Sequence, residues 1–197
     1  MSDFRAIKAV CDAVLGVLRS NCFPEDFNTT ELVFNVFLAP NFKTGMDAGV
    51  SLFMYRVLVN GTHRTPSPKP MPDGRRFLTQ LPLDLHFILT AWGKDYSMTH
   101  SITGWMMRVM EDNPVIPSGF LQNIAPGVFK ENETVEISSA EFSTEDLLRL
   151  WEVTAQNNYQ LSVPYVARNI RIDSTHPVIS GTVIQEREFG FKGHESQ

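Results

Sequence analysis

The sequence predicts an α/β (α+β) fold in which a mixed, largely antiparallel sheet packs against helices. Some segments place apolar residues at the three- and four-residue steps of an amphipathic helix. Others are rich in β-branched and aromatic residues, and turn signals separate several of them. Strands joined by turns favour antiparallel pairing, and each helix needs an apolar sheet face to pack against. The predicted order is α, β, β, β, α, β, α, β, followed by a polar arm.

Composition limits the functional classes. The 197 residues, 43% of them hydrophobic and 20% charged, suit one soluble domain. A formal net charge of -5 gives no general attraction to nucleic acid or to an anionic membrane, so neither is an expected partner. No stretch approaches the ~18 apolar residues that cross a bilayer, and the first residues lack the pattern of a signal peptide. We expect synthesis in the cytoplasm and no membrane insertion.

Of the two cysteines, Cys11 lies inside the first predicted helix and Cys22 lies just beyond its end. A disulfide between them would need a tight reversal of the chain, and small disulfide frameworks use more cysteines than two. We expect two free thiols in a reducing compartment.

The first helix is expected to start at Ser2 or Asp3, which can accept hydrogen bonds as an N-cap, and to end near Asn21, before Pro24. Its apolar stripe consists of Phe4, Ile7, Val10, Val14, Val17 and Leu18.

Three strands are predicted next, over residues 31–38, 49–59 and 83–92. The second ends at the turn signal Asn60-Gly61. In the third, apolar residues alternate with Asp84 and His86, which share the opposite face. Such alternation is typical of a strand that is buried on one side.

The second half of the chain repeats both patterns. A helix is expected from Ser97 or Thr99 to Asn113, where Pro114 ends it. Its buried stripe consists of Ile102, Trp105, Met106, Val109 and Met110. A strand over residues 133–139, a short helix that starts after Ser143, and a strand over residues 161–173 follow. The short helix buries Leu147, Leu150 and Trp151. Pro164 predicts that the last strand is an edge strand or contains a bulge.

Catalytic and metal-binding patterns are missing from the sequence. It has no glycine-rich phosphate loop, and Ser118 and Ser180 lack the flanks of a nucleophile elbow. No partner base marks Cys22 as a nucleophile. One alternative stays open, a metal or general-base site of Asp84, His86 and His100, which would make the chain a metal-dependent hydrolase. We expect no enzyme activity, no cofactor and no metal.

Two polar segments are too long to be simple connections. Prolines alternate through residues 62–74, so this loop should be extended and should bind with little loss of entropy. The whole loop, from Gly61 to Arg76, has one acid, Asp73, against five bases, which predicts an acidic protein partner; the bases are His63, Arg64, Lys69, Arg75 and Arg76. In the polar tail, Val183, Ile184, Phe189 and Phe191 are apolar anchors that can add to a neighbour's sheet edge. Arg56, Arg168 and Arg171 on strands fit a local protein-binding patch better than a nucleic-acid surface.

Several of these segments together resemble the N-terminal domain family of cap (tail terminator) proteins from extracellular contractile injection systems, of the antifeeding-prophage and virulence-cassette type. The most specific stretch is Leu-Pro-Leu-Asp-Leu-His at residues 81–86. The Glu-Asp-Leu helix at 145–147 and the Leu-Ser-Val strand at 161–163 follow in the same order. The resemblance spans residues 1–175 and leaves residues 176–197 as a C-terminal arm.

The resemblance implies the fold of phage tail terminators and a structural role. Such proteins form a ring, usually sixfold, that ends the inner tube and anchors the distal end of the sheath. The implied partners are further copies of the chain, the inner tube protein and the sheath protein, in a particle that can be released from the cell. A second class stays open, a monomeric adaptor that binds one protein through the basic proline loop.

Overall fold

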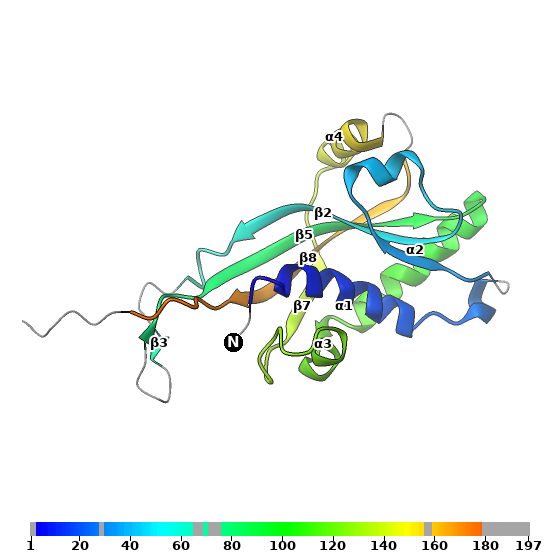
Figure 1. Cartoon of the computed structure of the whole chain (residues 1–197). Coiled ribbons are helices and arrows are strands. Elements are labelled where there is room, and N and C mark those ends of the chain that lie inside the picture. The colour runs from blue at the N-terminus through cyan, green and yellow to red at the C-terminus, as the bar shows by residue number, and fades with distance from the viewer. Residues whose placement is uncertain (1–2, 28–29, 65–68, 71–75, 156–158, 179–197) are drawn as a thin grey trace, which may run out of the picture.

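A computed structural model describes residues 3–27, 30–64, 69–70, 76–155 and 159–178. Its main sheet has six strands in the order β1-β2-β5-β8-β7-β6, and β3 and β4 form a separate two-stranded sheet (Figure 1). The elements, with η for 3-10 helices, are α1 (Ala6–Ser20), η1 (Pro24–Phe27), β1 (Val33–Val36), η2 (Ala39–Lys43), β2 (Gly49–Val59), β3 (Lys69–Pro70), β4 (Arg76–Phe77), β5 (Leu81–Trp92), α2 (Tyr96–Asp112), β6 (Val115–Ile116), α3 (Ser118–Ile124), β7 (Val135–Ser139), α4 (Thr144–Ala155) and β8 (Ser162–Ile172).

The centre of the sheet is formed by β2, β5 and β8, which are 11, 12 and 11 residues long. Both of their pairings are antiparallel, whereas β1 runs parallel to β2. The predicted mixed, largely antiparallel sheet packed with helices is therefore confirmed. The boundaries of β2 agree with the prediction, and β5, β7 and β8 differ from it by one or two residues.

One face of the sheet carries the main core. Alternate residues of β5, such as Leu85 and Leu89, point to this face and are fully buried. They pack against α1 and against the stripe of α2 that contains Ile102 and Met106. Helix α3 lies on the outer side of α1, which is therefore buried on most of its circumference.

The opposite face carries a second, smaller cluster under η2 and α4. It joins Ile88 and Trp92 of β5 to Phe42 of η2 and Trp151 of α4. The rings of Phe42 and Trp151 meet edge to face, with centroids 5.1 Å apart. The predicted burial of Trp151 is confirmed, while Leu147 and Leu150 are partly buried against the same cluster.

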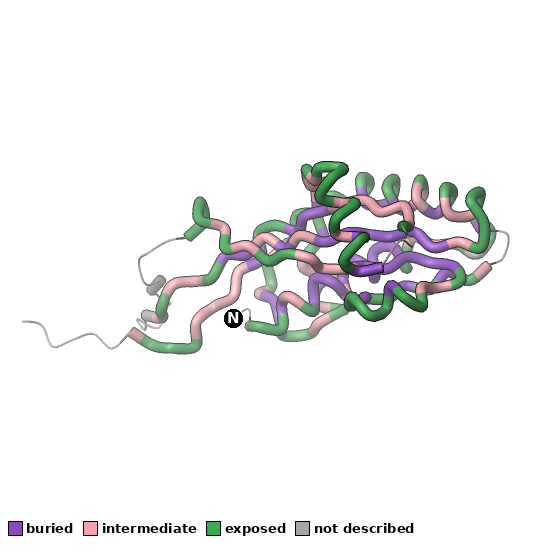
Figure 2. The backbone as a smooth tube through the Cα atoms, turned by 90° about the horizontal axis from the view of Figure 1, so that it is seen from above, coloured by how far each residue is buried: buried purple, intermediate pink, exposed green. Residues whose placement is uncertain are grey.

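The molecule is elongated along the strands. Burial is concentrated where helices cover both faces of the sheet, and the opposite end consists of exposed or half-buried residues (Figure 2). That end, on the left in Figures 1 and 2, is formed by the end of β2, the start of β5, the end of β8 and the small β3–β4 sheet. We call it the projecting end.

The predicted starts of both long helices are wrong. Helix α1 begins at Ala6, and Asp3 caps the preceding turn by accepting a hydrogen bond from the Arg5 backbone N–H (2.8 Å). Phe4 thus lies before the helix and is 78% exposed, outside the buried stripe in which the sequence placed it. Helix α2 begins at Tyr96 because Asp95 accepts from the Met98 backbone N–H (2.8 Å).

Two other expectations need correction. Strand β8 lies inside the sheet, between β5 and β7, so Pro164 does not mark an edge strand. The carbonyl of Pro164 accepts from Ala140, just beyond the last β7–β8 pair, where its missing N–H costs no ladder hydrogen bond. The other half of that prediction holds for the strand but not at Pro164, because between the pairs Leu85–Ala167 and Leu83–Ile170 β8 advances three residues against two of β5 and so contains the irregularity. Trp105, expected in the core, is only partly buried and donates from Nε1 to the Asn21 carbonyl (3.3 Å).

Candidate functional site

The basic proline loop leaves the sheet at Asn60, directly after β2. The side-chain amide of Asn60 donates to both carboxylate oxygens of Asp84 on β5, at 3.1 and 3.2 Å. Its carbonyl oxygen accepts from the backbone N–H groups of Thr62 (3.1 Å) and His63 (3.3 Å). Asn60 therefore fixes the direction in which the loop leaves the projecting end.

The predicted binding cations of the loop are only partly within the described residues. His63 and Arg64 are exposed immediately after the Asn60 turn. The backbones of Lys69 and Arg76 belong to β3 and β4, in which Lys69 pairs with Phe77 and Pro70 with Arg76. Arg75 lies outside the described residues. The loop therefore contains a short antiparallel pair, which fits the expected extended conformation.

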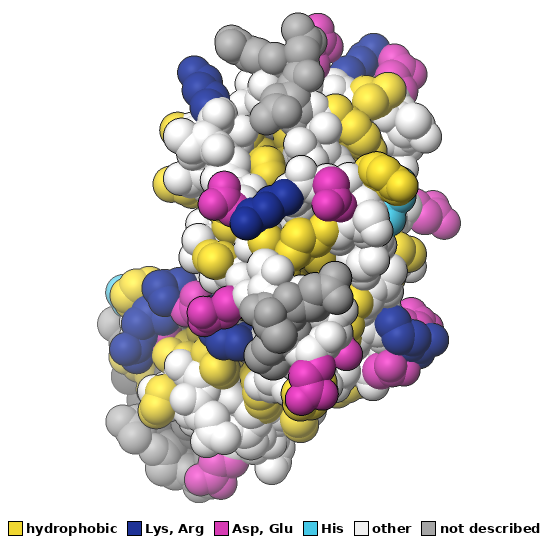
Figure 3. Space-filling view, turned by 90° about the vertical axis from the view of Figure 1, so that its right-hand side faces the viewer, with side chains coloured by type: hydrophobic (Ala, Val, Ile, Leu, Met, Phe, Trp, Pro, Cys, Tyr) yellow, Lys and Arg dark blue, Asp and Glu magenta, His cyan; other side chains and the backbone are white. Residues whose placement is uncertain are grey.

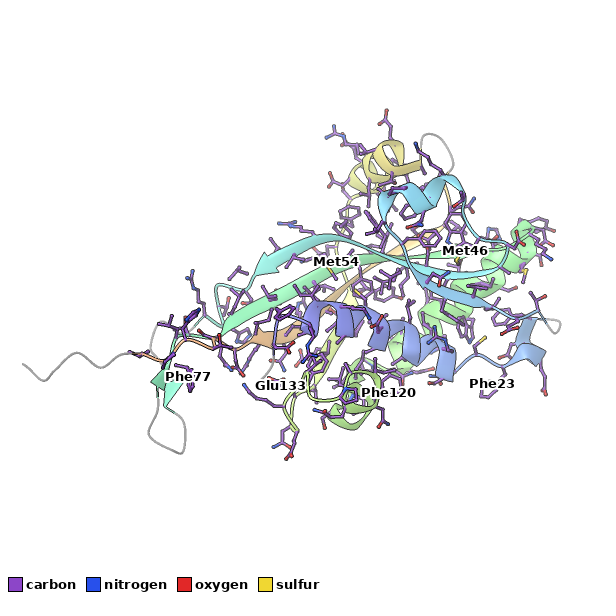
Figure 4. All side chains as sticks on the ribbon, in the orientation of Figure 1. Phe23, Met46, Met54, Phe77, Phe120 and Glu133 are labelled. Carbon is purple, nitrogen blue, oxygen red and sulfur yellow. The ribbon has the colours of Figure 1, made fainter. Side chains whose placement is uncertain are left out.

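The start of the C-terminal arm lies against this small sheet. Pro177 forms an antiparallel bridge with Phe77, and the Leu78 backbone N–H donates to the His176 carbonyl (3.1 Å). Phe77 lies beside β3 at the far tip of the molecule (Figure 4). The predicted anchors Val183, Ile184, Phe189 and Phe191 lie outside the described residues. The structure thus places the start of the C-terminal arm beside the end of the basic proline loop, two segments that are far apart in the sequence.

A polar network fixes the end of β8 just before the arm. Asp173 forms an ion pair with Lys130 (2.7 Å) and accepts a hydrogen bond from Gln80. Lys130 also lies 3.7 Å from Glu133, on the turn labelled in Figure 4. Beside this network is an open, polar depression of ≈ 670 Å³, lined by residues that include Gln80, Lys130, Asn169 and Arg171. These contacts hold the root of the arm in one position relative to the sheet.

Helix α4 covers only part of the sheet face opposite the main core. The uncovered part carries three basic side chains on neighbouring strands, Arg56, His86 and Arg168. Arg56 on β2 pairs in register with His86 on β5, and Arg168 on β8 donates to Ser138 (3.1 Å). Burial lowers the pKa of His86 from its ordinary value, and the charges of Arg56 and Arg168 lower it further, against an opposing effect of Asp84. The two arginines proposed as part of a protein-binding patch therefore lie on one surface.

The alternative metal or general-base site is not assembled. Asp84 and His86 point to the face of β5 opposite the main core, while His100 belongs to α2, which packs on the core face. His100 instead contacts Tyr96, with ring centroids 6.1 Å apart. Within the described part of the chain, no group of three or more His, Cys, Asp or Glu side chains is placed to hold a metal ion.

The projecting end also exposes aliphatic side chains. Val57 and Val59 at the end of β2, Leu81 at the start of β5 and Leu78 beside the arm are all exposed. The other end of the molecule, which faces the viewer in Figure 3, mixes acidic, basic and apolar side chains, and none of the three kinds dominates. Exposed aliphatic groups beside a fixed loop and a fixed arm are what a protein-binding surface offers. No helix in the described ranges is long and apolar enough to span a membrane.

A family model described as the Pvc16 N-terminal domain matches residues 9–186. The chain belongs to this family. The family resemblance expected from the sequence is therefore confirmed. A search of curated proteins found no match.

Two solved structures share the fold of this Pvc16 N-terminal domain protein. One is the sheath/tube terminator of an extracellular contractile injection system, PVC, in the extended state. It is 16% identical, with a TM-score of 0.63 over 97% of this chain and 65% of that chain. The other is the tube terminating cap of the anti-feeding prophage, also 16% identical, with a TM-score of 0.60 over 92% of this chain and 60% of that chain. The chain therefore spans less than two thirds of either solved protein. Both are named as structural components, in line with the expectation that this chain is not an enzyme.

Proposed function

We propose that the chain is a structural cap of a contractile injection system. In this proposal, several copies, six in the simplest arrangement, form a ring that terminates the inner tube and anchors the distal end of the sheath. The observation that carries it is the shared fold over 97% of the chain with a protein named as a sheath/tube terminator. The family match over residues 9–186 supports the same role.

The partners follow from this role. A ring contacts further copies of itself on two sides, and the last layers of tube protein and sheath protein beneath it. The protein would be made in the cytoplasm and would become part of the particle, with which it can leave the cell. Such a task needs complementary surfaces and no reaction.

We place the contacts on the basic loop and the C-terminal arm. Both leave from the projecting end, where Asn60 fixes the loop and the Phe77–Pro177 bridge holds the arm against β4. The binding residues proposed are His63, Arg64, Lys69, Arg75, Arg76, Val183, Ile184, Phe189 and Phe191. We further propose that residues 1–175 form the domain and residues 176–197 the arm. The first residues of the arm, His176 and Pro177, lie against the domain.

The test uses two variants in cells that assemble the particle. One carries Arg64→Glu, Arg75→Glu and Arg76→Glu, and the other is truncated after Val178 so that the Pro177 bridge is kept. Both should fold as the parent does but fail to cap, giving sheathed particles of irregular length. Arg149→Glu is the control, because Arg149 is exposed on α4 and forms an ion pair with Glu145, one helical turn away. Particles of uniform, normal length from both variants would show that capping does not use these segments.

The second candidate function is a monomeric adaptor that binds one acidic protein through the loop. The exposed His63 and Arg64 at the loop root are compatible with it. Light scattering of the purified chain, with and without isolated inner tube, separates the two. A cap gives a multimer on the tube end, and an adaptor binds as a single copy.

A further inference from the structure

More than half of β2 pairs with a strand of the described residues on only one side. Strand β1 pairs with Gly49–Leu52 and ends there, while β2 continues to Val59. From Phe53 onwards, β2 pairs with β5 on one side, and no strand of the described residues pairs with it on the other. Figures 1 and 4 show β2 as the outermost strand from about Met54 to the projecting end. Among the described residues this stretch is therefore a free sheet edge, and we call it the β2 edge.

The direction of the backbone groups on the β2 edge follows from its register. The Asn60 N–H donates to the Pro82 carbonyl, so Asn60 points its backbone toward β5. Backbone groups alternate along an antiparallel strand, and Leu58 and Arg56 therefore point the same way as Asn60. Val57 and Val59 point their N–H and C=O groups outward, where an added strand would accept and donate hydrogen bonds.

The side chains along the β2 edge are unusually apolar for an uncovered position. Val57 and Val59 are 45% and 51% exposed, although their partners Leu85 and Leu83 on the same face are buried. β-branched residues at an open edge favour pairing with another chain, and natural edges normally carry lysine, proline or a bulge to prevent it. The irregularity of β2 lies between Met54 and Arg56, before the two valines, and leaves them unprotected.

We infer that the β2 edge accepts a strand from the C-terminal arm of a second copy of the chain, around Thr182, Val183 and Ile184. These consecutive β-branched residues suit a strand, and they follow the last described residue, Val178, by only a few positions. The arm and the β2 edge both lie at the projecting end. The inference rests on the proposed ring, since cyclic symmetry places the projecting ends of neighbouring copies at the same height and distance from the axis.

The strand order disfavours pairing of the arm with its own β2 edge. The arm continues from β8, which lies on the other side of β5 from β2. To reach its own β2 edge, the arm would have to cross two strand spacings, each about 4.8 Å, and then reverse direction. We therefore assign the arm to the edge of a neighbouring copy in the proposed ring.

Disulfide trapping in the full chain tests whether the arm of a second copy occupies the β2 edge. Cysteine replaces Val57 or Val59 in one position and Thr182, Val183 or Ile184 in the other, with Cys22→Ser removing the accessible native thiol. Assembled caps are oxidised and separated on a non-reducing gel. We expect a ladder of covalent multimers from at least one pair, and only dimers when the two cysteines are placed on separate, co-expressed chains.

The control pair combines Val183→Cys with Val153→Cys, which is 82% exposed on α4, and should give no ladder. A fast-migrating monomer with an internal disulfide would mean that the arm pairs with its own β2 edge. Absence of any cross-link from all pairs would mean that the arm binds elsewhere. Either result overturns the inference.

A second variant separates this inference from the proposed function. Val57→Lys with Val59→Lys keeps the pairing of β2 with β5, because both backbones point outward, but repels an added strand. We expect folded protein that no longer forms the ring. Uniformly capped particles from this variant would be consistent with the cap function but would show that the ring does not use the β2 edge as an interface. If the unaltered chain neither forms a ring nor caps particles, the proposed function itself fails.

Discussion

The amide of Asn60 and the carboxylate of Asp84 are joined by two hydrogen bonds, at 3.1 and 3.2 Å, across the last pairs of β2 and β5. The same Asn60 side chain accepts two backbone N–H groups of the loop with its oxygen. One side chain thus couples the sheet to the exit of the basic loop. Asp84, an alternative candidate for metal or base chemistry, is a partner in this structural contact.

Replacing Asn60 by alanine should loosen the loop and leave the sheet folded. The change removes the partner of Asp84 and the acceptor of two backbone N–H groups, at a cost of about 1–2 kcal/mol in a half-buried position. Urea unfolding measures that loss, and hydrogen exchange should quicken at Thr62 and His63. Thr62→Ala is the control, since it keeps the backbone N–H that bonds to Asn60. Equal stability of both variants would contradict this role.

Two buried tryptophans allow a matched test of what an indole hydrogen bond contributes. Trp92 donates from Nε1 to Ser51 Oγ at 2.8 Å, and both residues are buried. Trp151, 3% exposed in the same cluster, has no hydrogen-bond partner for its Nε1 among the described residues. Trp92→Phe should therefore destabilise more than Trp151→Phe, by about 1–2 kcal/mol, because it leaves the Ser51 hydroxyl buried without a partner.

The double variant Trp92→Phe with Ser51→Ala tests the cause of that difference. Removing both partners of a buried hydrogen bond costs less than removing one. The double variant should recover part of the stability lost in Trp92→Phe, as measured by thermal unfolding. Strictly additive losses would show that lost volume, and not the hydrogen bond, sets the cost.

The predictable parts of the fold are those in which local signals agree. Strand β2 has its predicted bounds because Gly49 and the Asn60-Gly61 turn punctuate a continuous β-rich run. The stripe of α2 with Ile102 and Met106 is likewise confirmed, since its spacing is helical over several turns. Boundaries set by a side-chain cap, such as Asp95 at α2, escape prediction because Ser97 and Thr99 offer equally good caps in the sequence.

Elements defined by tertiary contacts could not be predicted. Helix α3 has only seven residues and is stabilised by packing Phe120 and Ile124 near Gly16 of α1. The parallel pairing of β1 with β2 depends on the crossover through η2, which carries no periodic pattern. At the projecting end, the sequence marks the loop and the arm only as separate segments. Their meeting at Phe77 and Pro177 joins positions far apart in the sequence, and no local signal reports it.

The pKa of His86 predicts an acid-sensitive contribution to stability. Burial and the charges of Arg56 and Arg168 lower this pKa below that of the unfolded chain, about 6.5. The unfolded chain then binds a proton more readily, so stability falls as the pH drops below about 6.5 and levels off below the folded pKa. His86→Gln should lose this part of the decline in melting temperature, and Arg56→Gln should reduce it by raising the pKa.

His63→Gln serves as the control for the histidine change, because His63 is exposed on the loop. An NMR titration of His86 checks the direction of the shift independently of unfolding. A His86 pKa above 6.5 would contradict the interpretation of this face as a basic surface.

Two glycine-to-alanine substitutions should change stability in opposite directions. Gly49 has a φ of 146° and lies opposite Val33 in the parallel pairing, where an added Cβ would clash with the Val33 carbonyl oxygen. Gly49→Ala should cost about 3 kcal/mol or more, because strained backbone and a steric clash combine. Gly104 lies inside α2, and a Cβ added there would meet no atom within 4 Å among the described residues. Gly104→Ala should therefore stabilise the helix by about 0.5–1 kcal/mol. Urea unfolding of both variants beside the parent measures the contrast. A Gly49→Ala protein as stable as the parent would mean that β1 does not pair with β2 at this position, and the sheet would then have a different edge.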